Sequence, residues 1–290
     1  MADMFRKNKG KICILASAFI YGLAPILAKI SYEGGANGIT LTFLRASMMV
    51  PLLFILLRAE HKSVYVSKTD ISKIAVLGVI GGTLPIALLY LSYNYISAGL
   101  ATTLHFIYPL IVVFASVFIY HEKITPFKML SAVLVTIGIV LFVEIETAAD
   151  KAGVMLALLS GIFYSFYVIY LDKSGLNRMD YIKLTFYVML TMSASSLIFG
   201  MAVNGIDFNM TPKAWIYSGI ISLLVTLLAT PLFQAGVKYE GASTAGVLST
   251  FEPITTTVLG FAFLGEQLGI VQIAGGAVII SGLVMAEKFG

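Results

Sequence analysis

Residues 74–120 read IAVLGVIGGTLPIALLYLSYNYISAGLATTLHFIYPLIVVFASVFIY, without one Asp, Glu, Lys or Arg. A membrane-spanning helix needs about 20 predominantly apolar residues. This run is therefore long enough for two such helices, and we expect the turn between them at Asn94 to Gly99. Membrane β-strands do not fit, because the apolar runs are too long and lack the alternation of a barrel.

The rest of the chain has the same character. Of 290 residues, 59% are hydrophobic and 12% are charged, against about 25% charged in soluble domains. The basic N-terminal segment resembles a signal peptide, but the apolar run after it continues to about Ala28 without a cleavage site, so we interpret it as an uncleaved first helix. We predict ten membrane-spanning helices, near residues 10–30, 38–57, 73–93, 98–119, 128–146, 151–171, 182–203, 214–236, 242–264 and 269–287.

The sequence also repeats itself. Adding 144 to a position between residues 95 and 138 gives a related residue, as for Pro109 and Pro253, and nearer the N-terminus the offset is 143. Each copy would hold five helices, an odd number, so the second copy crosses the membrane in the opposite sense. We therefore predict an all-α polytopic membrane protein of two inverted five-helix repeats, residues 1–147 and 148–290.

Lys and Arg are distributed unevenly between the predicted loops. With the N-terminus in the cytoplasm, 15 of them lie on the inner side and 3 on the outer side, and Arg45 lies inside a span. Because cytoplasmic loops are enriched in Lys and Arg, we predict that both termini are cytoplasmic and that the chain lies in the inner (plasma) membrane. The net charge of +4 belongs to these loops and does not indicate nucleic-acid binding.

Glu252 is the most informative polar residue. It lies about ten residues into the predicted span 242–264, near the midplane, where a charged side chain is costly. Desolvation favours the neutral carboxyl there, so we expect reversible protonation near neutral pH. The alternative is a structural carboxyl that stays neutral and hydrogen-bonded to a neighbouring helix. Ser249 and Thr256 share its helix face.

The repeat supplies a second polar face. Glu252 corresponds to Tyr108 and Ser249 to His105, and each pair lies beside a helix-interrupting proline. Equivalent helices of inverted repeats meet near the axis where substrates bind. We therefore predict that all four residues line a substrate site, and that Glu252 and His105 couple transport to protons. The alternatives are an interhelical hydrogen bond for His105 and core packing for Tyr108.

Aromatic residues provide further candidates for the substrate site. Tyr21 and Pro25 lie one turn apart on the first predicted helix, and Tyr164 matches Tyr21 on the sixth. An aromatic pair placed by symmetry suits a cavity wall that accepts apolar parts of a substrate. Tyr90 and Gln234, which correspond to each other nearer the helix ends, complete the set.

Arg45 lies about seven residues inside the second predicted span, about 10 Å from the outer surface. Three interpretations remain open from the sequence. The guanidinium could bind a substrate anion, pair with a carboxylate such as Glu252, or extend to the surface along its aliphatic stem.

Enzyme signatures are absent from the sequence. There is no His/Cys metal spacing and no Gly-rich phosphate loop, and the chain has three His. An intramembrane hydrolase built from Ser249 and His105 is the enzymatic alternative, but the repeat accounts for that pair. We predict no catalytic residue, no metal and no cofactor.

Three motifs point to a family. They are Tyr-Pro-Leu…His-Glu-Lys (Tyr108 to Lys123), Phe-Glu-Pro-Ile…Leu-Gly-Glu (Phe251 to Glu266) and Phe-Leu-Arg (Phe43 to Arg45). With them, essentially the whole chain resembles the EamA-type transporters of the drug/metabolite transporter superfamily. The resemblance implies a ten-helix inner-membrane carrier with a central cavity, which exports amino acids or other small metabolites. Glu252 matches the family's Glu-Pro pair, whereas Tyr108 departs from that acidic pattern.

Together these inferences predict a carrier that works by alternating access, around a cavity lined by helices 1, 3, 4, 6, 8 and 9. Protonation of Glu252 would bias which side is open, so that a proton entering drives substrate outward. The alternatives are an uncoupled facilitator, a lipid or lipid-linked sugar flippase, and a membrane sensor. The expected partners are a small-molecule substrate and the lipid bilayer, and a monomer is sufficient although a homodimer is compatible with the sequence.

Overall fold

The computed structural model describes residues 8–96, 98–123, 125–142, 150–264 and 269–289. Within these ranges all regular structure is helical, which confirms the predicted class. Seven helical stretches are long and apolar enough to cross a membrane: Lys9–Glu33, Gly38–Ala59, Lys68–Ser92, Leu100–Phe118, Lys151–Lys173, Tyr181–Ala202 and Pro212–Leu248. Two shorter apolar helices cover Pro126–Leu141 and Ile273–Met285.

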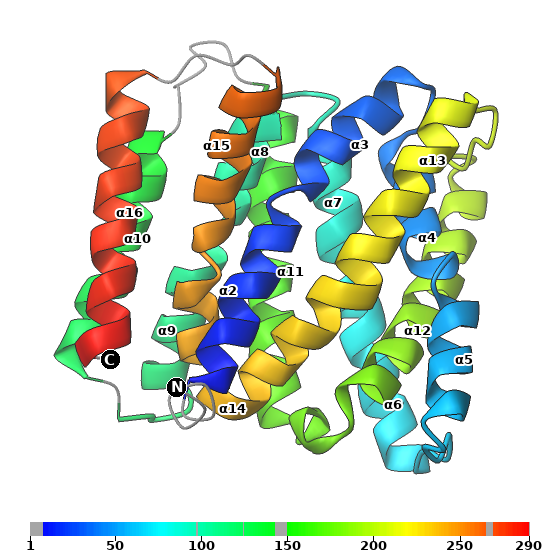
Figure 1. Ribbon diagram of the computed structural model, residues 1–290, viewed down its shortest axis with the longest axis horizontal. Helices are drawn as coiled ribbons and strands as arrows, with labels where there is room; N and C mark the ends of the chain where they lie inside the picture. Colours follow the sequence, from blue (N-terminus) through cyan, green and yellow to red (C-terminus); the bar gives the residue numbers. More distant parts are fainter. Residues whose placement is uncertain (1–7, 97, 124, 143–149, 265–268, 290) are drawn as a thin grey trace.

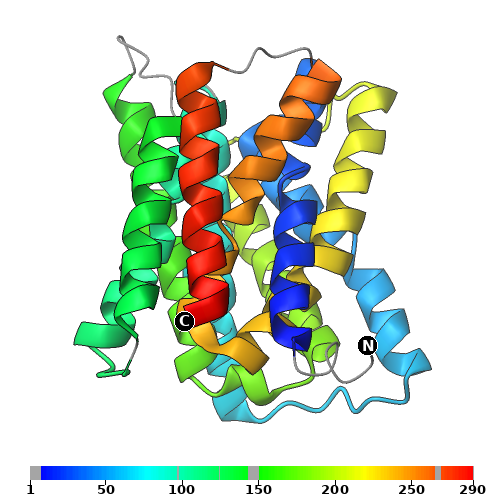
Figure 2. The same ribbon diagram turned by 60° about the vertical axis from the view of Figure 1, so that its left-hand side comes forward.

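The helices stand side by side in one bundle (Figure 1). The first half of the chain forms α2 (Lys9–Tyr21), α3 (Ala24–Glu33), α4 (Gly38–Ser47), α5 (Val50–Ala59), α6 (Lys68–Val76), η1 (Leu77–Thr83), α7 (Leu84–Ser92), α8 (Ala98–His105), α9 (Tyr108–Phe118) and α10 (Pro126–Phe142). The second half forms α11 (Lys151–Lys173), η2 (Leu176–Arg178), α12 (Tyr181–Ala202), α13 (Pro212–Ile221), η3 (Ser222–Ala229), α14 (Thr230–Leu248), α15 (Phe251–Leu264) and α16 (Ile270–Phe289). Both chain ends lie at the lower end in Figures 1 and 2.

Prolines interrupt several of the predicted spans. Pro25, Pro51 and Pro109 each lie in the first turn of a new helix segment, namely α3, α5 and α9. A proline has no N–H and its ring clashes with the carbonyl four residues earlier, so the helix breaks in front of it. The π-helical turns η1 and η3 are likewise followed by Pro85 and Pro231. By contrast, α11 and α12 contain no proline and run unbroken.

The stretch Pro212–Leu248 is not one straight helix. Gly241 has φ 77° and ψ 169°, a positive φ that glycine adopts without a steric penalty. In Figure 1 the chain descends through α13, turns at the lower end where α14 is labelled, and ascends through α15. The turn falls between the predicted spans 214–236 and 242–264.

Close contacts at glycines follow the sequence repeat. A Cβ on Gly10 would lie 2.7 Å from the Cβ of Tyr239, and a Cβ on Gly153 would lie 2.7 Å from the Cβ of Tyr95. Gly10 and Gly153 are repeat equivalents, and so are Tyr239 and Tyr95. The start of α2 therefore packs on the second copy in the same way as the start of α11 packs on the first.

The helices α10 and α16 show the same reciprocity, and they stand side by side at one edge of the bundle (Figures 1 and 2). A Cβ on Gly138 would lie 2.7 Å from Ile279, and one on its equivalent Gly282 would lie 2.8 Å from Val135, the equivalent of Ile279. The two copies thus interlock symmetrically. The exact division at residues 147 and 148 stays a prediction, and residues 143–149 lie outside the described ranges.

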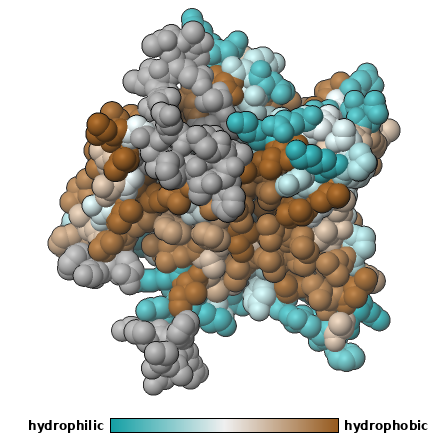
Figure 3. All heavy atoms as spheres, turned by 45° about the horizontal axis from the view of Figure 1, so that its top comes forward, coloured by the Kyte–Doolittle hydropathy of each residue, from teal (hydrophilic) through white to brown (hydrophobic). Residues whose placement is uncertain are grey.

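The surface matches a membrane environment. Apolar residues cover the middle of the face shown in Figure 3, and polar residues gather toward its margins. In water, contiguous apolar surface of this kind would promote association. An apolar belt between polar ends is what a bilayer requires.

Candidate functional site

A pocket lies where the interrupted helices converge. Its lining comes from α2, α3, α4, α7, the turn after α7, α8, α11 and α15. The twelve lining residues are Tyr21, Ala24, Pro25, Arg45, Ile86, Leu89, Tyr90, Tyr93, Thr102, His105, Tyr164 and Glu252.

Seven residues that the sequence suggested line this pocket: Tyr21, Pro25, Arg45, Tyr90, His105, Tyr164 and Glu252. The other three candidates, Tyr108, Gln234 and Ser249, do not. The pocket also differs from the predicted cavity because the second span contributes Arg45 and the span 214–236 contributes no lining residue.

Sequence reasoning missed five lining residues: Ala24, Ile86, Leu89, Tyr93 and Thr102. The sequence spacing could have indicated three of them. Ile86, Leu89 and Tyr93 have helical spacing around Tyr90, so they share a face with it. Apolar residues at this spacing are equally typical of core packing, and only the neighbouring helices show that this face borders a pocket.

Glu252 is positioned by a helix break. It lies in the first turn of α15, directly after the interruption at Ser249 and Thr250, where the positive end of the helix dipole favours a carboxylate. The break between α2 and α3 packs against the same turn, because a Cβ on Gly22 would lie 2.9 Å from the carbonyl oxygen of Glu252. Thr256 Oγ1 also donates a hydrogen bond of 3.0 Å to the carbonyl of Gly22.

Arg45 does not extend to the surface, which excludes one of its three interpretations. The residue is only 7% exposed, and its guanidinium carbon lies 6.0 Å from the centroid of the Tyr21 ring. None of the ion pairs found among the described residues joins Arg45 to Glu252. Two opposite formal charges thus face one pocket without pairing.

Two polar atoms of the pocket lack hydrogen-bond partners. They are Nε of Arg45 and the hydroxyl of Tyr90, and Tyr90 is 3% exposed. Six buried side-chain polar atoms in the described part of the chain lack partners, so a third of them belong to this one pocket. Buried polar groups are normally satisfied, and each exception needs an explanation.

His105 joins two helices and also lines the pocket. Its Nδ1 lies 2.6 Å from Ser160 Oγ on α11, and its ring lies 5.2 Å from Tyr164 and 5.5 Å from Tyr108 between centroids. The interhelical hydrogen bond expected as an alternative is therefore present. It does not remove His105 from the pocket.

An aromatic layer adjoins the pocket toward the end of the bundle that carries the chain termini, since Tyr167 follows Tyr164 along α11 toward Lys173. Tyr108, 1% exposed, packs edge-on against Tyr164 at 4.7 Å, and Tyr164 stacks on Tyr167 at 5.7 Å. Gln234 donates to the Tyr167 hydroxyl at 3.1 Å and accepts from Thr185 at 2.9 Å. Tyr108 and Gln234 thus do not line the pocket but contact the aromatic residues beside it.

Ser249 does not line the pocket, and its hydroxyl donates to the carbonyl of Ala245 at 2.7 Å. In the part of the chain that the structure describes, no group of three or more His, Cys, Asp or Glu is placed to hold a metal ion. Glu266, at the end of the second motif, lies outside the described residues.

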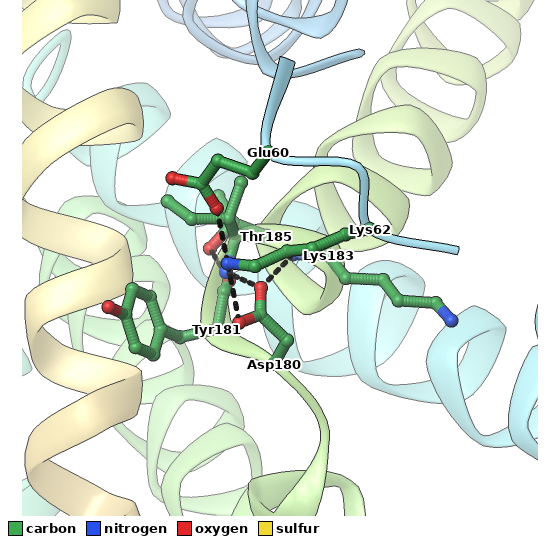
Figure 4. A network of polar contacts seen from close by, with 7 residues as sticks. Glu60, Lys62, Asp180, Tyr181, Lys183 and Thr185 are labelled. Atoms are coloured by element: carbon green, nitrogen blue, oxygen red, sulfur yellow. Dashed lines mark hydrogen bonds and ion pairs between the residues drawn. The ribbon is translucent and has the colours of Figure 1, made fainter. Parts of the chain in front are cut away.

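A polar network lies at the lower end of the bundle, below the aromatic layer. Lys62, in the loop between α5 and α6, forms ion pairs with Glu60 and, at 2.7 Å, with Asp180 (Figure 4). Asp180 caps α12 by accepting hydrogen bonds from the amides of Ile182 and Lys183. This network fastens a loop of the first half to a helix of the second.

Further bonds reinforce the same closure. Lys183 donates to the carbonyl of Tyr65, and Tyr187 donates to the carbonyl of Val64. Lys173 at the end of α11 pairs with Glu122, which lies between α9 and α10. The end of the bundle that carries the chain termini is thus bridged by ion pairs and hydrogen bonds between the two halves of the chain.

Comparison with known proteins identifies the architecture. The chain matches the EamA-like transporter family twice, over residues 8–144 and 151–287. It is 27% identical over 278 residues to the uncharacterized transporter YcbK of Bacillus subtilis, covering 92% of this chain and 88% of that protein. An uncharacterized transporter of Clostridium kluyveri is 25% identical over 302 residues, covering 96% and 93%. One solved crystal structure superposes with a TM-score of 0.80 at 15% identity, covering 97% of this chain and 98% of the other, and shows a shared fold alone.

Proposed function

This chain belongs to the EamA-like transporter family, and on that premise we propose that it carries small metabolites, amino acids or related compounds, across the inner membrane by alternating access. Like the other members of this transporter family, it is a membrane transporter and not an enzyme. The substrate class, the direction of transport and its coupling to protons are the proposal.

We propose ten membrane crossings, five in each repeat. The reversal at Gly241 divides Pro212–Leu248 so that one crossing ends before it and the next continues into α15. The two shorter apolar helices, α10 and α16, pair closely and supply one further crossing to each repeat. Both chain ends then lie on one side, which the excess of Lys and Arg assigns to the cytoplasm.

The observation that carries the proposal is a pair of oppositely charged side-chain types in the pocket that form no direct ion pair. Arg45 and Glu252 both line it, from different repeats, without forming an ion pair. Ionisable groups within a membrane are costly and mark transport pathways. Interrupted helices at membrane depth are tolerated where they line a cavity, and carriers of inverted repeats bind substrate there.

The position of the pocket along the bundle fits a carrier that works by alternating access. Tyr90 and Tyr93 lie at the end of the span Lys68–Ser92 that is remote from the chain termini, whereas the terminal side is closed. We interpret this arrangement as an outward-facing state. Protonation of Glu252 from the outside would favour the return to the inward-facing state, because the two states bind the proton differently.

The test is transport into and out of proteoliposomes under an imposed pH gradient, with a panel of labelled amino acids and related metabolites. We expect flux that depends on the gradient in the wild type, its loss in Glu252→Gln, and its retention in Glu33→Gln. Glu33 is a suitable control because its exposed carboxylate lies 4.0 Å from Lys213 at the rim. Equal rates with and without a gradient would show a facilitator, and full coupling in Glu252→Gln would refute proton coupling at this residue.

A further inference from the structure

We propose that Arg45 and Tyr90 form a receptor for a carboxylate group, so that this carrier accepts only substrates that bear one. The inference rests on the proposed function, since it names the chemical group that the same pocket requires. In this proposal Arg45 binds the substrate and does not form a structural ion pair within the protein.

The state of Arg45 is the first reason. The side chain is buried, its Nε has no partner, and no carboxylate of the described residues is paired with it. A buried charge without a direct ion-pair partner is costly. A guanidinium presents parallel N–H groups that match the two oxygens of a carboxylate, so a carboxylate ligand would remove this cost.

The state of Tyr90 is the second reason. Its ring packs 5.8 Å from the Tyr93 ring, and its backbone carbonyl accepts a hydrogen bond from Tyr32. Its hydroxyl nevertheless has no partner although the residue is 3% exposed. A phenol held rigidly with a free O–H is prepared to donate to a ligand.

The two groups belong to helices that pack directly on each other. A Cβ on Gly38, at the start of α4, would lie 2.9 Å from the Cβ of Tyr90 on α7. Helical side chains lean toward the N-terminus of their helix. Arg45 lies two turns further along α4, so this tendency directs its side chain toward the level of Tyr90, and both residues line the same pocket.

The charges of the lining favour a carboxylate over a phosphate. Arg45 is the one Lys or Arg among the twelve lining residues, and Glu252 is the one acidic residue. A phosphate dianion would bring two negative charges to one guanidinium beside a carboxylate. A compound with one carboxylate and one ammonium group matches Arg45 and Glu252 together, and the rings of Tyr21, Tyr93 and Tyr164 provide an aromatic wall for its side chain.

Two matched sets of labelled compounds test the inference in proteoliposomes. The first is L-phenylalanine, 3-phenylpropanoate without the ammonium group, and 2-phenylethylamine without the carboxylate. The second is L-leucine, 4-methylpentanoate and 3-methylbutylamine. We expect wild-type protein to move members that bear a carboxylate and to exclude both amines.

Variants assign this selectivity to the two residues. Arg45→Gln should raise the KM for carboxylates by about 100-fold, as expected for the loss of a buried charged partner, and Arg45→Lys should recover part of it. Tyr90→Phe should raise the KM by about tenfold, the cost of one hydrogen bond. Lys213→Gln, which removes an exposed cation at the rim, should leave the KM unchanged, and monodisperse elution will show that each variant is folded.

The outcomes separate this inference from the proposed function. Transport of the amines at the rate of the amino acids, or a wild-type KM for carboxylates in folded Arg45→Gln and Arg45→Lys, would refute the carboxylate receptor and leave the carrier intact. No movement by the wild type of any member of either set, or of any compound of the larger panel, would overturn both.

Discussion

Asp180 uses one carboxylate for two purposes. One oxygen accepts hydrogen bonds from the amides of Ile182 and Lys183, and the other lies 2.7 Å from Lys62. Burial raises the pKa of Asp180, but the hydrogen bonds from Lys62 and from the two amides outweigh it and hold the pKa below its usual value. The helix cap is worth about 1 kcal/mol, and a partly exposed ion pair at most about 1 kcal/mol.

Two substitutions separate these contributions. Asp180→Asn keeps an acceptor for the cap and loses the ion pair, so we expect it to lower stability by less than about 1 kcal/mol. Asp180→Ala loses both and should cost about 1 to 2 kcal/mol. Because the pKa of Asp180 is lowered in the folded protein, the ion-pair contribution is present above the usual Asp pKa of about 4 and is lost as the pH falls further.

Thermal unfolding in detergent between pH 7 and pH 3 measures the contribution of this ion pair to stability. The difference between wild type and Asp180→Asn should be constant down to about pH 4 and shrink below it. A difference that persists unchanged at pH 3 would show that the charge of Asp180 does not contribute to stability.

Single residues also show what a sequence reveals about a site. Glu252 and Arg45 were predicted because a charge within an apolar span needs a reason, and His105 because the repeat aligned it with Ser249. The network of Lys62 and Asp180 was not predicted. Both residues lie in polar loops where charges are ordinary, and nothing in the sequence places these loops together.

At the scale of helices, six of the seven long apolar stretches begin and end within five residues of a predicted span, and Pro212–Leu248 is the exception. The interruptions of the helices were predicted only in part. Pro109 and Pro253 were recognised as helix-interrupting. The π-helical turns η1 and η3 were not, because π-turns depend on tertiary packing and no residue type marks them. The first span also continues to Glu33, beyond the predicted limit at residue 30, since nothing between Pro25 and Gly34 breaks the helix.

The close packing of α10 against α16 allows a prediction at the scale of helices. A methyl group on Gly138 would meet the Ile279 side chain at 2.7 Å and the Gly275 carbonyl at 2.8 Å, and one on Gly282 would meet Val135 at 2.8 Å. Forcing the helices apart should cost about 1 to 3 kcal/mol. Gly138→Ala and Gly282→Ala should therefore destabilise the protein by similar amounts.

A third alanine substitution serves as the control. A Cβ on Gly219, in α13, would meet only Met48 at 3.9 Å, and alanine is the better helix former by about 1 kcal/mol. Gly219→Ala should thus be neutral or stabilising in thermal unfolding. If Gly138→Ala behaves like Gly219→Ala, the two helices are not held by close backbone contact.

For the whole molecule, the pocket and the polar network lie on opposite sides of the aromatic layer. Alternating access requires that the side now closed by Lys62 and Asp180 opens while the pocket side closes. The loop between α5 and α6 and the start of α12 must then separate in each transport cycle. Their ion pair is partly exposed and worth little, which suits a contact that is broken and re-formed.

A reversible cross-link tests this requirement. Cys13, the one cysteine of the chain, is first replaced in Cys13→Ser. Lys62→Cys and Asp180→Cys are then introduced together and joined by a short bifunctional methanethiosulfonate. We expect the cross-link to reduce flux in proteoliposomes at least tenfold, because a joined closure cannot release the pocket to the inner side, and a reductant should restore the flux.

The same reagent on each single cysteine variant controls for modification alone and should leave flux unchanged. Binding of a transported compound, measured as thermal stabilisation in detergent, should survive the cross-link, since the pocket lies on the other side of the aromatic layer. Loss of flux with retained binding would locate the effect in the conformational step. Wild-type flux in the cross-linked protein would mean that these elements move together, and that the inner opening forms elsewhere in the bundle.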